Sequence, residues 1–185
     1  MAIQLAVAVG DMRPVQFRPY ENAWPERFAI AKDLICGALD GCAARIEHIG
    51  STAVPDLPGR PQLDMQVAVA EMDAEEDYRW LLEELGFSLQ VREPDRRVFY
   101  ARAGALPSHV PACDTLVYVC RAGGVWEHDQ LLLRTYLIDH PARREQYAEF
   151  KARLAKENRH DPEAYAEAKR PFLRETIRLA QRAYR

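Results

Sequence analysis

The chain has 185 residues, of which 48% are hydrophobic and 29% are charged, and its formal net charge is −3. These values predict one ordinary globular domain and argue against intrinsic disorder. The charge is uneven, because residues 126–185 carry 13 Lys and Arg against 10 Asp and Glu, whereas residues 1–125 carry 12 against 18. A mildly basic C-terminal part suits a phosphate-bearing small molecule better than a long nucleic acid, which usually meets a denser basic stripe.

The cysteines and the N-terminus indicate the compartment. The four cysteines form two pairs spaced six and seven residues apart, with no CxxC or Cys/His ligand spacing, so we expect buried free thiols in a reducing cytoplasm. Residues 2–9 are apolar, but the run is short and lacks a basic region before it. It fits neither a secretory signal nor a membrane span, and we assign residues 1–13 to a frayed or strand-like N-terminal extension.

The first part of the chain predicts a helix followed by two strands. Residues 15–20 alternate in polarity, and Asn22 is the expected N-cap of a helix over 23–40 whose apolar residues recur at helical spacing. Residues 45–49 and 62–70 are then expected to form strands, joined by a Gly-Ser turn and a proline-rich loop.

A second helix and three further strands are expected before residue 124. Asp73 and Glu76 have the spacing of a capping box, and Gly86 stands where a left-handed residue ends a helix. The strands are predicted over 87–91, 98–102 and 115–121, with a turn at Pro94-Asp95 and a loop over 104–112.

The remainder of the chain is predicted to be helical. Helices are expected over 126–139, 142–157 and 163–183, with Asp161-Pro162 as N-cap and first helical residue, and with Pro171 kinking or interrupting the last one. Strands first and helices last predict an α+β fold, a mixed β-sheet flanked by helices with a C-terminal helical subregion. We therefore predict one domain over 14–185, with an α/β part over 14–124 and a helical part over 125–185.

The segment from Arg45 to Val69 carries the candidate site. Gly50 allows a sharp turn and leaves no Cβ between the backbone and a ligand, and Ser51 adds a hydroxyl beside backbone N–H groups. Asp64 lies on an apolar strand, where alternation places it on the face opposite Leu63 and its neighbours. A phosphate-binding turn facing a metal-binding carboxylate would suit nucleotidyl transfer. From spacing alone, however, an ordinary strand-to-helix connection and a solvent-facing carboxylate explain these residues as well.

The same segment contains a distinctive set of residues, namely His48-Ile49-Gly50-Ser51-Thr52-Ala53-Val54-Pro55, Leu57, Arg60-Pro61 and Asp64. This set resembles the signature of the GrpB family, which belongs to the nucleotidyltransferase superfamily that includes DNA polymerase β. The C-terminal half also matches in order and spacing, at Leu133-Arg134, Tyr136-Leu137, His140-Pro141, Tyr147, Lys151-Ala152-Arg153-Leu154-Ala155, Tyr165, Lys169 and Phe172. The resemblance covers roughly residues 14 to 183.

The resemblance implies a nucleotidyltransferase fold and a role for each matching residue. Gly50 and Ser51 would hold the phosphates of a nucleoside triphosphate, and Asp64 would be the catalytic residue and bind Mg²⁺. Positive side chains would offset the ligand charge, namely those of Arg60, Arg134, Lys151 and Lys169. Any one of the three helical residues Arg134, Lys151 and Lys169, taken alone, is better explained as part of a solvated helix face. As a set, the resemblance favours ligand binding for them. His48 and Gln66 would contact the residues that hold the ligand rather than the ligand itself. A role in packing explains the presence of His48 equally well.

The chain also departs from the family pattern. Gln66 stands where active relatives outside GrpB usually carry a second acid, and a family His-x-His pair aligns near Thr115-Leu116-Val117, where both imidazoles are missing. Asp56 replaces a usual glycine and places a negative charge near the predicted phosphate site.

Three hypotheses therefore remain open. The chain is an enzyme that transfers a nucleotidyl group to an unknown small acceptor, or it is a catalytically degenerate module that binds a nucleotide or phosphate. In the third, its C-terminal helices contact a protein partner, and an exposed apolar patch would be the sign.

Overall fold

The computed structural model describes residues 13–184, so nearly all of the predicted N-terminal extension lies outside the described residues. Within this range, five strands form one sheet in the order β1-β2-β5-β4-β3. The strands are β1 (Ala43–Ile49), β2 (Gln62–Val69), β3 (Ser88–Glu93), β4 (Arg96–Ala101) and β5 (Asp114–Arg121). Strands β2 and β5 run parallel, and the other neighbouring pairs run antiparallel, so the sheet is mixed.

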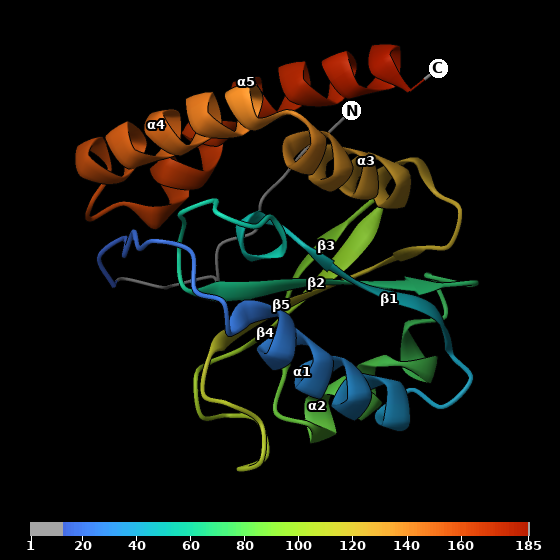
Figure 1. Cartoon of the computed structure of the whole chain (residues 1–185). Helices are drawn as coiled ribbons and strands as arrows, with labels where there is room; N and C mark the ends of the chain where they lie inside the picture. Colours follow the sequence, from blue (N-terminus) through green and yellow to red (C-terminus); the bar gives the residue numbers. More distant parts are fainter. Residues whose placement is uncertain (1–12, 185) are drawn as a thin grey trace.

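Helices cover both faces of the sheet (Figure 1). Helices α1 (Trp24–Ala38) and α2 (Arg79–Glu84) lie on one face. The C-terminal helices lie on the other and are α3 (Val125–Asp139), α4 (Pro141–Glu157) and α5 (Pro162–Ala183). Two short 3₁₀ turns, Ser51–Ala53 and Glu75–Asp77, complete the elements. The predicted α+β class with C-terminal helices is confirmed.

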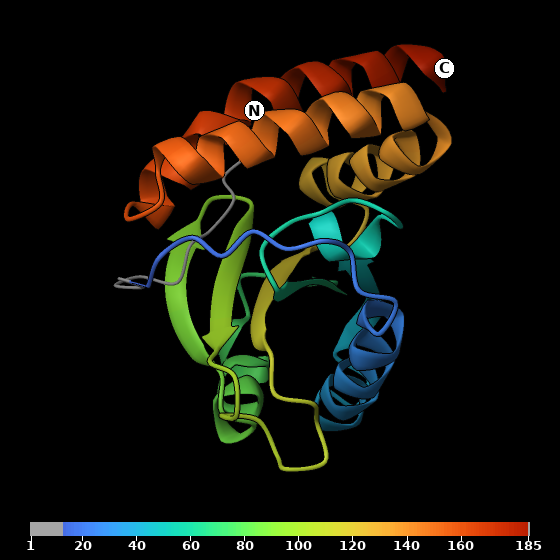
Figure 2. The ribbon, with the colours of Figure 1, turned by 60° about the vertical axis from the view of Figure 1, so that its left-hand side comes forward.

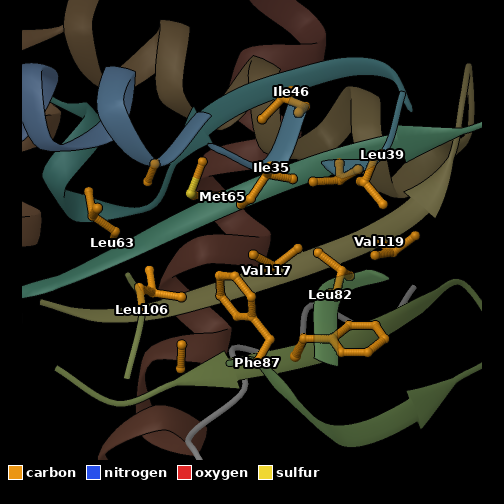
Figure 3. Packing of buried hydrophobic residues seen from close by; sticks show 14 of the residues in the cluster. Ile35, Leu39, Ile46, Leu63, Met65, Leu82, Phe87, Leu106, Val117 and Val119 are labelled. Carbon is orange, nitrogen blue, oxygen red and sulfur yellow. The ribbon is translucent and has the colours of Figure 1, made fainter. Parts of the chain in front are cut away.

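The larger core lies between the sheet and α1 and α2. Leu63, Met65 and Val67 of β2 alternate toward this face, where they pack with Ile35 of α1 and Leu82 of α2 (Figure 3). The alternation predicted for β2 from its sequence therefore identifies the strand face that is buried most completely.

The opposite face of β2 is also covered, because α3 lies over it. Ala68 packs there with Ile49, Leu116 and Trp126. Asp64 lies on this second face, opposite the apolar residues, as the alternation predicts. The carboxylate is half-buried between the sheet and the C-terminal helices rather than exposed on an open surface.

The segment before α1 is extended but is not a strand of the sheet. The backbone of Arg18 pairs with that of Gly59 in an isolated antiparallel bridge, and the Val15 N–H donates to the carbonyl of Arg159 at 2.7 Å. Figure 2 shows this segment, in dark blue, crossing the molecule on its way to α1. It therefore ties the loop that precedes β2 to the turn between α4 and α5.

Two of the predicted helix starts are wrong. The N-cap of α1 is Ala23 rather than Asn22, and no side chain caps it. The capping box of Asp73 and Glu76 does not form, since α2 begins only at Arg79. Nearby acidic groups pair with arginines of the β3–β4 hairpin instead: Glu75 accepts two hydrogen bonds from Arg92, and Asp73 accepts one from Arg97. The acidic residues of this segment therefore form ion pairs with distant arginines instead of capping a helix.

The start of α5 is as predicted, whereas the interruption considered at Pro171 is absent. Asp161 is the N-cap, and its carboxylate accepts a hydrogen bond from the Ala164 N–H at 2.9 Å. The helix passes through Pro171 without interruption. Pro171 is exposed, so the hydrogen bond that its ring nitrogen cannot donate is lost on the solvent side, where water can replace it.

The four cysteines are free thiols, but two of them are not buried. Cys113 and Cys120 lie in the core, whereas Cys36 is exposed and Cys42 is partly exposed. Among the described residues, no helix is long and apolar enough to cross a bilayer.

Candidate functional site

A narrow cleft separates the Gly-Ser turn and β2 from the C-terminal helices. It holds a volume of about 50 Å³. The polar residues around it are Gly50, Ser51, Asp64, Gln130, Arg134 and Lys169, and the apolar ones are Val54, Leu57, Leu133, Leu137, Tyr147 and Leu173. The structure thus brings the predicted turn, the predicted acid and two of the predicted cations to one cleft.

Gly50 is the point at which backbone and carboxylate meet. Its φ of 72° and ψ of −165° lie in a region that is essentially restricted to glycine. A Cβ at this position would lie 2.9 Å from both Cβ and Cγ of Asp64, and closer still to Oδ2. The turn therefore needs glycine for two reasons, its conformation and the approach of the Asp64 side chain.

The Asp64 carboxylate is held by side chains of the sheet. Gln62 Nε2 donates to Oδ1 at 2.9 Å, and the Tyr118 hydroxyl donates to the same oxygen at 3.4 Å. Burial raises the pKa of the Asp64 carboxyl above its usual range, although these hydrogen bonds and the positive charges of Lys169 and Arg60 oppose the rise.

Lys151 reaches the turn from α4, one hundred residues away in the sequence. Its Nζ donates to Ser51 Oγ at 2.9 Å and to the carbonyl of Pro58 at 2.5 Å, and the residue is 1% exposed. Burial lowers the pKa of Lys151 well below its usual value, and the positive charge of Lys169 lowers it further. The ammonium also lies 4.6 Å from the ring centroid of Tyr147, a cation–π contact.

Lys169 of α5 adds a second, partly buried lysine at the cleft. Burial lowers its pKa from 10.5 to about 7, and the charge of Arg60 contributes to the fall. The negative charge of Asp64 acts in the opposite direction on both lysines. Three cations thus surround one carboxylate in a poorly hydrated place, and a bound anion would relieve this imbalance.

Arg134 of α3 borders the same cleft but is already engaged. Its Nη1 donates to Glu47 Oε2 at 3.0 Å and to the carbonyl of His48 at 2.6 Å. Arg134 therefore fixes the end of β1 in addition to facing the cleft, and its charge is partly neutralised by Glu47.

His48 does not line the cleft. Its ring stacks on Phe28 with centroids 4.7 Å apart, and Nε2 lies 2.9 Å from Thr52 Oγ1. Because that hydroxyl donates to the carbonyl of Gln62, it accepts from His48, so Nε2 carries the proton. Burial lowers the pKa of His48 to about 4, which keeps the ring neutral. Of the two roles considered for His48, the structure favours packing.

Gln66 is fully buried beside the cleft rather than in it. Within residues 13–184, neither its amide nitrogen nor its amide oxygen has a hydrogen-bond partner. It lies on the face of β2 that carries Asp64, so a second acid at this position would point the same way.

The face of β5 beside Asp64 holds other residues than those aligned with the missing histidine pair. Leu116 and Tyr118 share the face of Asp64, whereas Val117 belongs to the core on the opposite face. Thr115 and Val117, the positions aligned with that pair, therefore do not face the cleft. Tyr118 makes a polar contact with Asp64.

The donor set does not fit a resident metal ion. Among the described residues, no group of three or more His, Cys, Asp and Glu is arranged to hold one. Of the residues that the structure describes, Asp64 is the only carboxylate that borders the cleft. One carboxylate binds Mg²⁺ weakly unless other oxygens complete its octahedron. A metal ion would have to come with the phosphates of a ligand, as part of that ligand.

Sequence reasoning missed several residues of the site. Gly59 packs so closely on Ser51 that a Cβ there would lie 2.9 Å from the serine Cβ. The position of Gly59 in the Pro-Gly-Arg-Pro string could have indicated a tight turn there. Nothing in the sequence near Gln62 and Tyr118 indicated their contacts with Asp64.

The predicted cation Arg60 borders a second, larger cavity, which Gln62 also lines.

The fold and the cleft define the class of the protein. It is an α+β protein whose mixed sheet is covered by helices on both faces and whose Gly-Ser turn lies against a strand carboxylate. A crystal structure of the Cid1 poly(U) polymerase is similar to this chain with a TM-score of 0.47 and 11% identity, over 73% of this chain and 45% of the other.

The chain belongs to the GrpB family, whose profile, described as GrpB protein, matches residues 14–178. It is 35% identical over 150 residues to the UPF0157 protein SCO7215 of Streptomyces coelicolor, which covers 81% of this chain and 75% of that protein. The crystal structure of the conserved protein GrpB from Enterococcus faecalis is similar with a TM-score of 0.79 and 25% identity, over 91% of this chain and 99% of the other.

Proposed function

We propose that this protein binds a phosphate-bearing small molecule, a nucleoside triphosphate in the first instance, with a phosphate group in the cleft beside Gly50 and Ser51. Lys151 and Lys169 neutralise the phosphate oxygens. Arg60 and Arg134 stand at the sides and contribute charge. Asp64 faces the same group and holds the lysines in place until the ligand binds.

The excess of buried positive charge around one acid carries this proposal. An ammonium group transferred from water to a poorly hydrated site is destabilising unless a counter-charge compensates it. Lys151 and Lys169 both have lowered pKa values for this reason, and Asp64 compensates them only in part. A dianionic phosphate supplies the missing negative charge and accepts the hydrogen bonds that Lys151 now donates to Ser51 and Pro58.

The size of the cleft defines which part of the ligand it takes. Pockets for drug-sized ligands measure roughly 300–1,000 Å³. The cleft, at about 50 Å³, has room for a phosphate-sized group but not for a nucleoside. The nucleoside therefore lies outside the cleft, or α5 moves outward when the ligand binds.

Nucleotidyl transfer is the second candidate, supported by the position of Asp64 directly against the turn. In it, the ligand is a magnesium complex of the nucleoside triphosphate, an acceptor hydroxyl attacks the α-phosphate, and pyrophosphate leaves. The single carboxylate argues against this candidate, since two-metal phosphoryl transfer uses several. Gln66, Leu116 and Tyr118 occupy the positions from which further metal ligands would reach the site. The reducing cytoplasm inferred from the cysteines is the place we propose for either activity.

Calorimetry with ATP, GTP and inorganic pyrophosphate, each with and without Mg²⁺, tests binding. The variant is Lys169→Met, which keeps most of the length of the side chain and removes the charge. Its matched control is Lys156→Met, since Lys156 is an exposed lysine of α4. A pyrophosphate-release assay with mixed acceptors, run on the same samples, tests transfer.

We expect at least one of these ligands to bind to the protein and to Lys156→Met, and its affinity for Lys169→Met to be at least tenfold lower. Binding without pyrophosphate release supports the binding module, and release supports the transferase. Equal affinity for all three proteins, or no heat and no change in melting temperature with any ligand, would refute the proposal.

A further inference from the structure

A second cavity lies on the other side of Gln62 from the cleft. It has a volume of about 350 Å³, within the range of small-molecule sites. Its walls come from the extended segment before α1, the first turns of α1, the residues just before β2, and the start of β5. Figure 2 shows the extended segment, in dark blue, running above this part of the sheet toward α1.

Arginines dominate the charge of this cavity. Four of them line it, namely Arg13, Arg18, Arg27 and Arg60, against the two carboxylates of Glu21 and Asp114. Arg13 pairs with Asp114 at 2.6 Å, and Arg27 pairs with Glu21 at 3.0 Å. Among residues 13–184, the lining of the cavity therefore holds four arginines and two carboxylates. Backbone contacts fix the segment that carries several of them.

The positions of two arginines are set by the fold. The backbone bridge between Arg18 and Gly59 places Arg18 beside the residue that precedes Arg60. The Arg18 guanidinium donates to the neutral amide of Gln16 at 3.0 Å, so its charge has no carboxylate partner in that contact. Arg27 lies 4.7 Å over the ring of Trp24, which orients its planar group.

The cavity and the cleft are neighbours that share a wall. Gln62 lines the cavity, and its amide donates to Asp64 in the cleft. Arg60 lines the cavity as well, and its charge acts on Asp64 and Lys169 across that wall. A group bound in the cavity would therefore lie next to the phosphate that we place in the cleft.

We propose that this cavity binds the phosphate group of a second small molecule, a phosphomonoester such as a sugar phosphate, beside the ligand of the cleft. Guanidinium groups suit this chemistry because their paired N–H groups match two phosphate oxygens. The inference goes beyond the proposed function, because it concerns other residues and a separate ligand; Arg60 is the single residue common to both.

The test uses the full chain and ribose 5-phosphate as the probe, with ribose as the uncharged control ligand. The variant is Arg18→Gln with Arg27→Gln, which removes two cavity charges at side chains that are exposed or partly exposed. Arg178→Gln, at an exposed position near the C-terminal end of α5, is the matched control. Lys169→Met reports on the cleft. Circular dichroism and melting temperature establish that each variant is folded.

We expect ribose 5-phosphate to bind, ribose not to bind, and the double variant to bind the sugar phosphate at least tenfold more weakly than Arg178→Gln does. The affinity for the cleft ligand should stay within about twofold in the double variant, and Lys169→Met should show the reverse pattern. These opposite binding patterns distinguish the two proposals, because a loss of binding at one site would leave binding at the other site unchanged.

Three results would overturn the inference. The first is no binding of ribose 5-phosphate at millimolar concentration, or equal binding of ribose. The second is an unchanged affinity in the double variant, which places the probe elsewhere. The third is an equal loss of sugar phosphate and cleft ligand in the double variant, which means that one ligand spans both places.

Discussion

Replacing Lys169 by methionine should make the protein more stable at neutral pH and weaken phosphate binding at least tenfold. Burial lowers the pKa of Lys169 from 10.5 in a free chain to about 7 in the folded protein. Between these two values the unfolded chain binds a proton that the folded protein does not. The free energy of unfolding therefore rises with pH across this window, by about 1.4 kcal/mol per pH unit for a single group. Below pH 7 both states are protonated, and the destabilisation by the buried charge is fully present.

The magnitude follows from the same two values. Between pH 7 and pH 9 the contribution of Lys169 should raise the free energy of unfolding by roughly 2 kcal/mol. Methionine has no charge and lacks this contribution, so the pH dependence of the variant should be flatter by that amount. At pH 7 the variant should be more stable than the protein by about 2 kcal/mol, allowing for the partial exposure of the lysine.

Urea denaturation at several pH values between 6 and 9, followed by circular dichroism, measures both quantities. Lys156→Met should leave the pH dependence unchanged, because that lysine is exposed. Parallel curves for Lys169→Met and the unmodified protein would refute the reasoning. They would mean that Lys169 titrates as a solvated lysine and that the cleft holds no unbalanced charge.

Three further substitutions test the geometry of the site. Gly50→Ala should lower the free energy of unfolding by about 2–4 kcal/mol, because the backbone there is strained for alanine and the new Cβ would meet Asp64. The control Gly37→Ala, at an exposed position of α1 where a Cβ has nothing within 4 Å, should raise it by about 0.5–1 kcal/mol. Equal effects of the two substitutions in urea denaturation would contradict the close approach of Gly50 and Asp64. Gln66→Met should raise the free energy of unfolding by about 1–3 kcal/mol, since it removes a buried amide that has no hydrogen-bond partner among residues 13–184. A loss of stability would show that the amide is hydrogen-bonded in solution. Asp64→Asn should bind magnesium-free pyrophosphate about fivefold more tightly, roughly 1 kcal/mol, because a like charge is removed; weaker binding by calorimetry would place the anion elsewhere.

Local sequence patterns were sufficient to predict the helices and strands of the fold. Within the site, they predicted the turn at Gly50 and the strand face of Asp64. Alternation along β2 predicts which face carries Asp64, and the glycine at position 50 predicts a turn that a side chain would obstruct. These predictions succeed because they depend on the geometry of a single strand and a single turn, which a few neighbouring residues define. The cap of Asp161 succeeds for the same reason.

Tertiary structure decided the partners of these residues. The parallel pairing of β2 with β5 places Tyr118 on Asp64, and the packing of α4 places Lys151 on Ser51 from one hundred residues away. Neither contact has a local pattern, since each depends on how whole layers pack. The charge balance of the cleft follows from that packing too, because a lysine on a helix is an ordinary solvated cation until another layer covers it and removes its water.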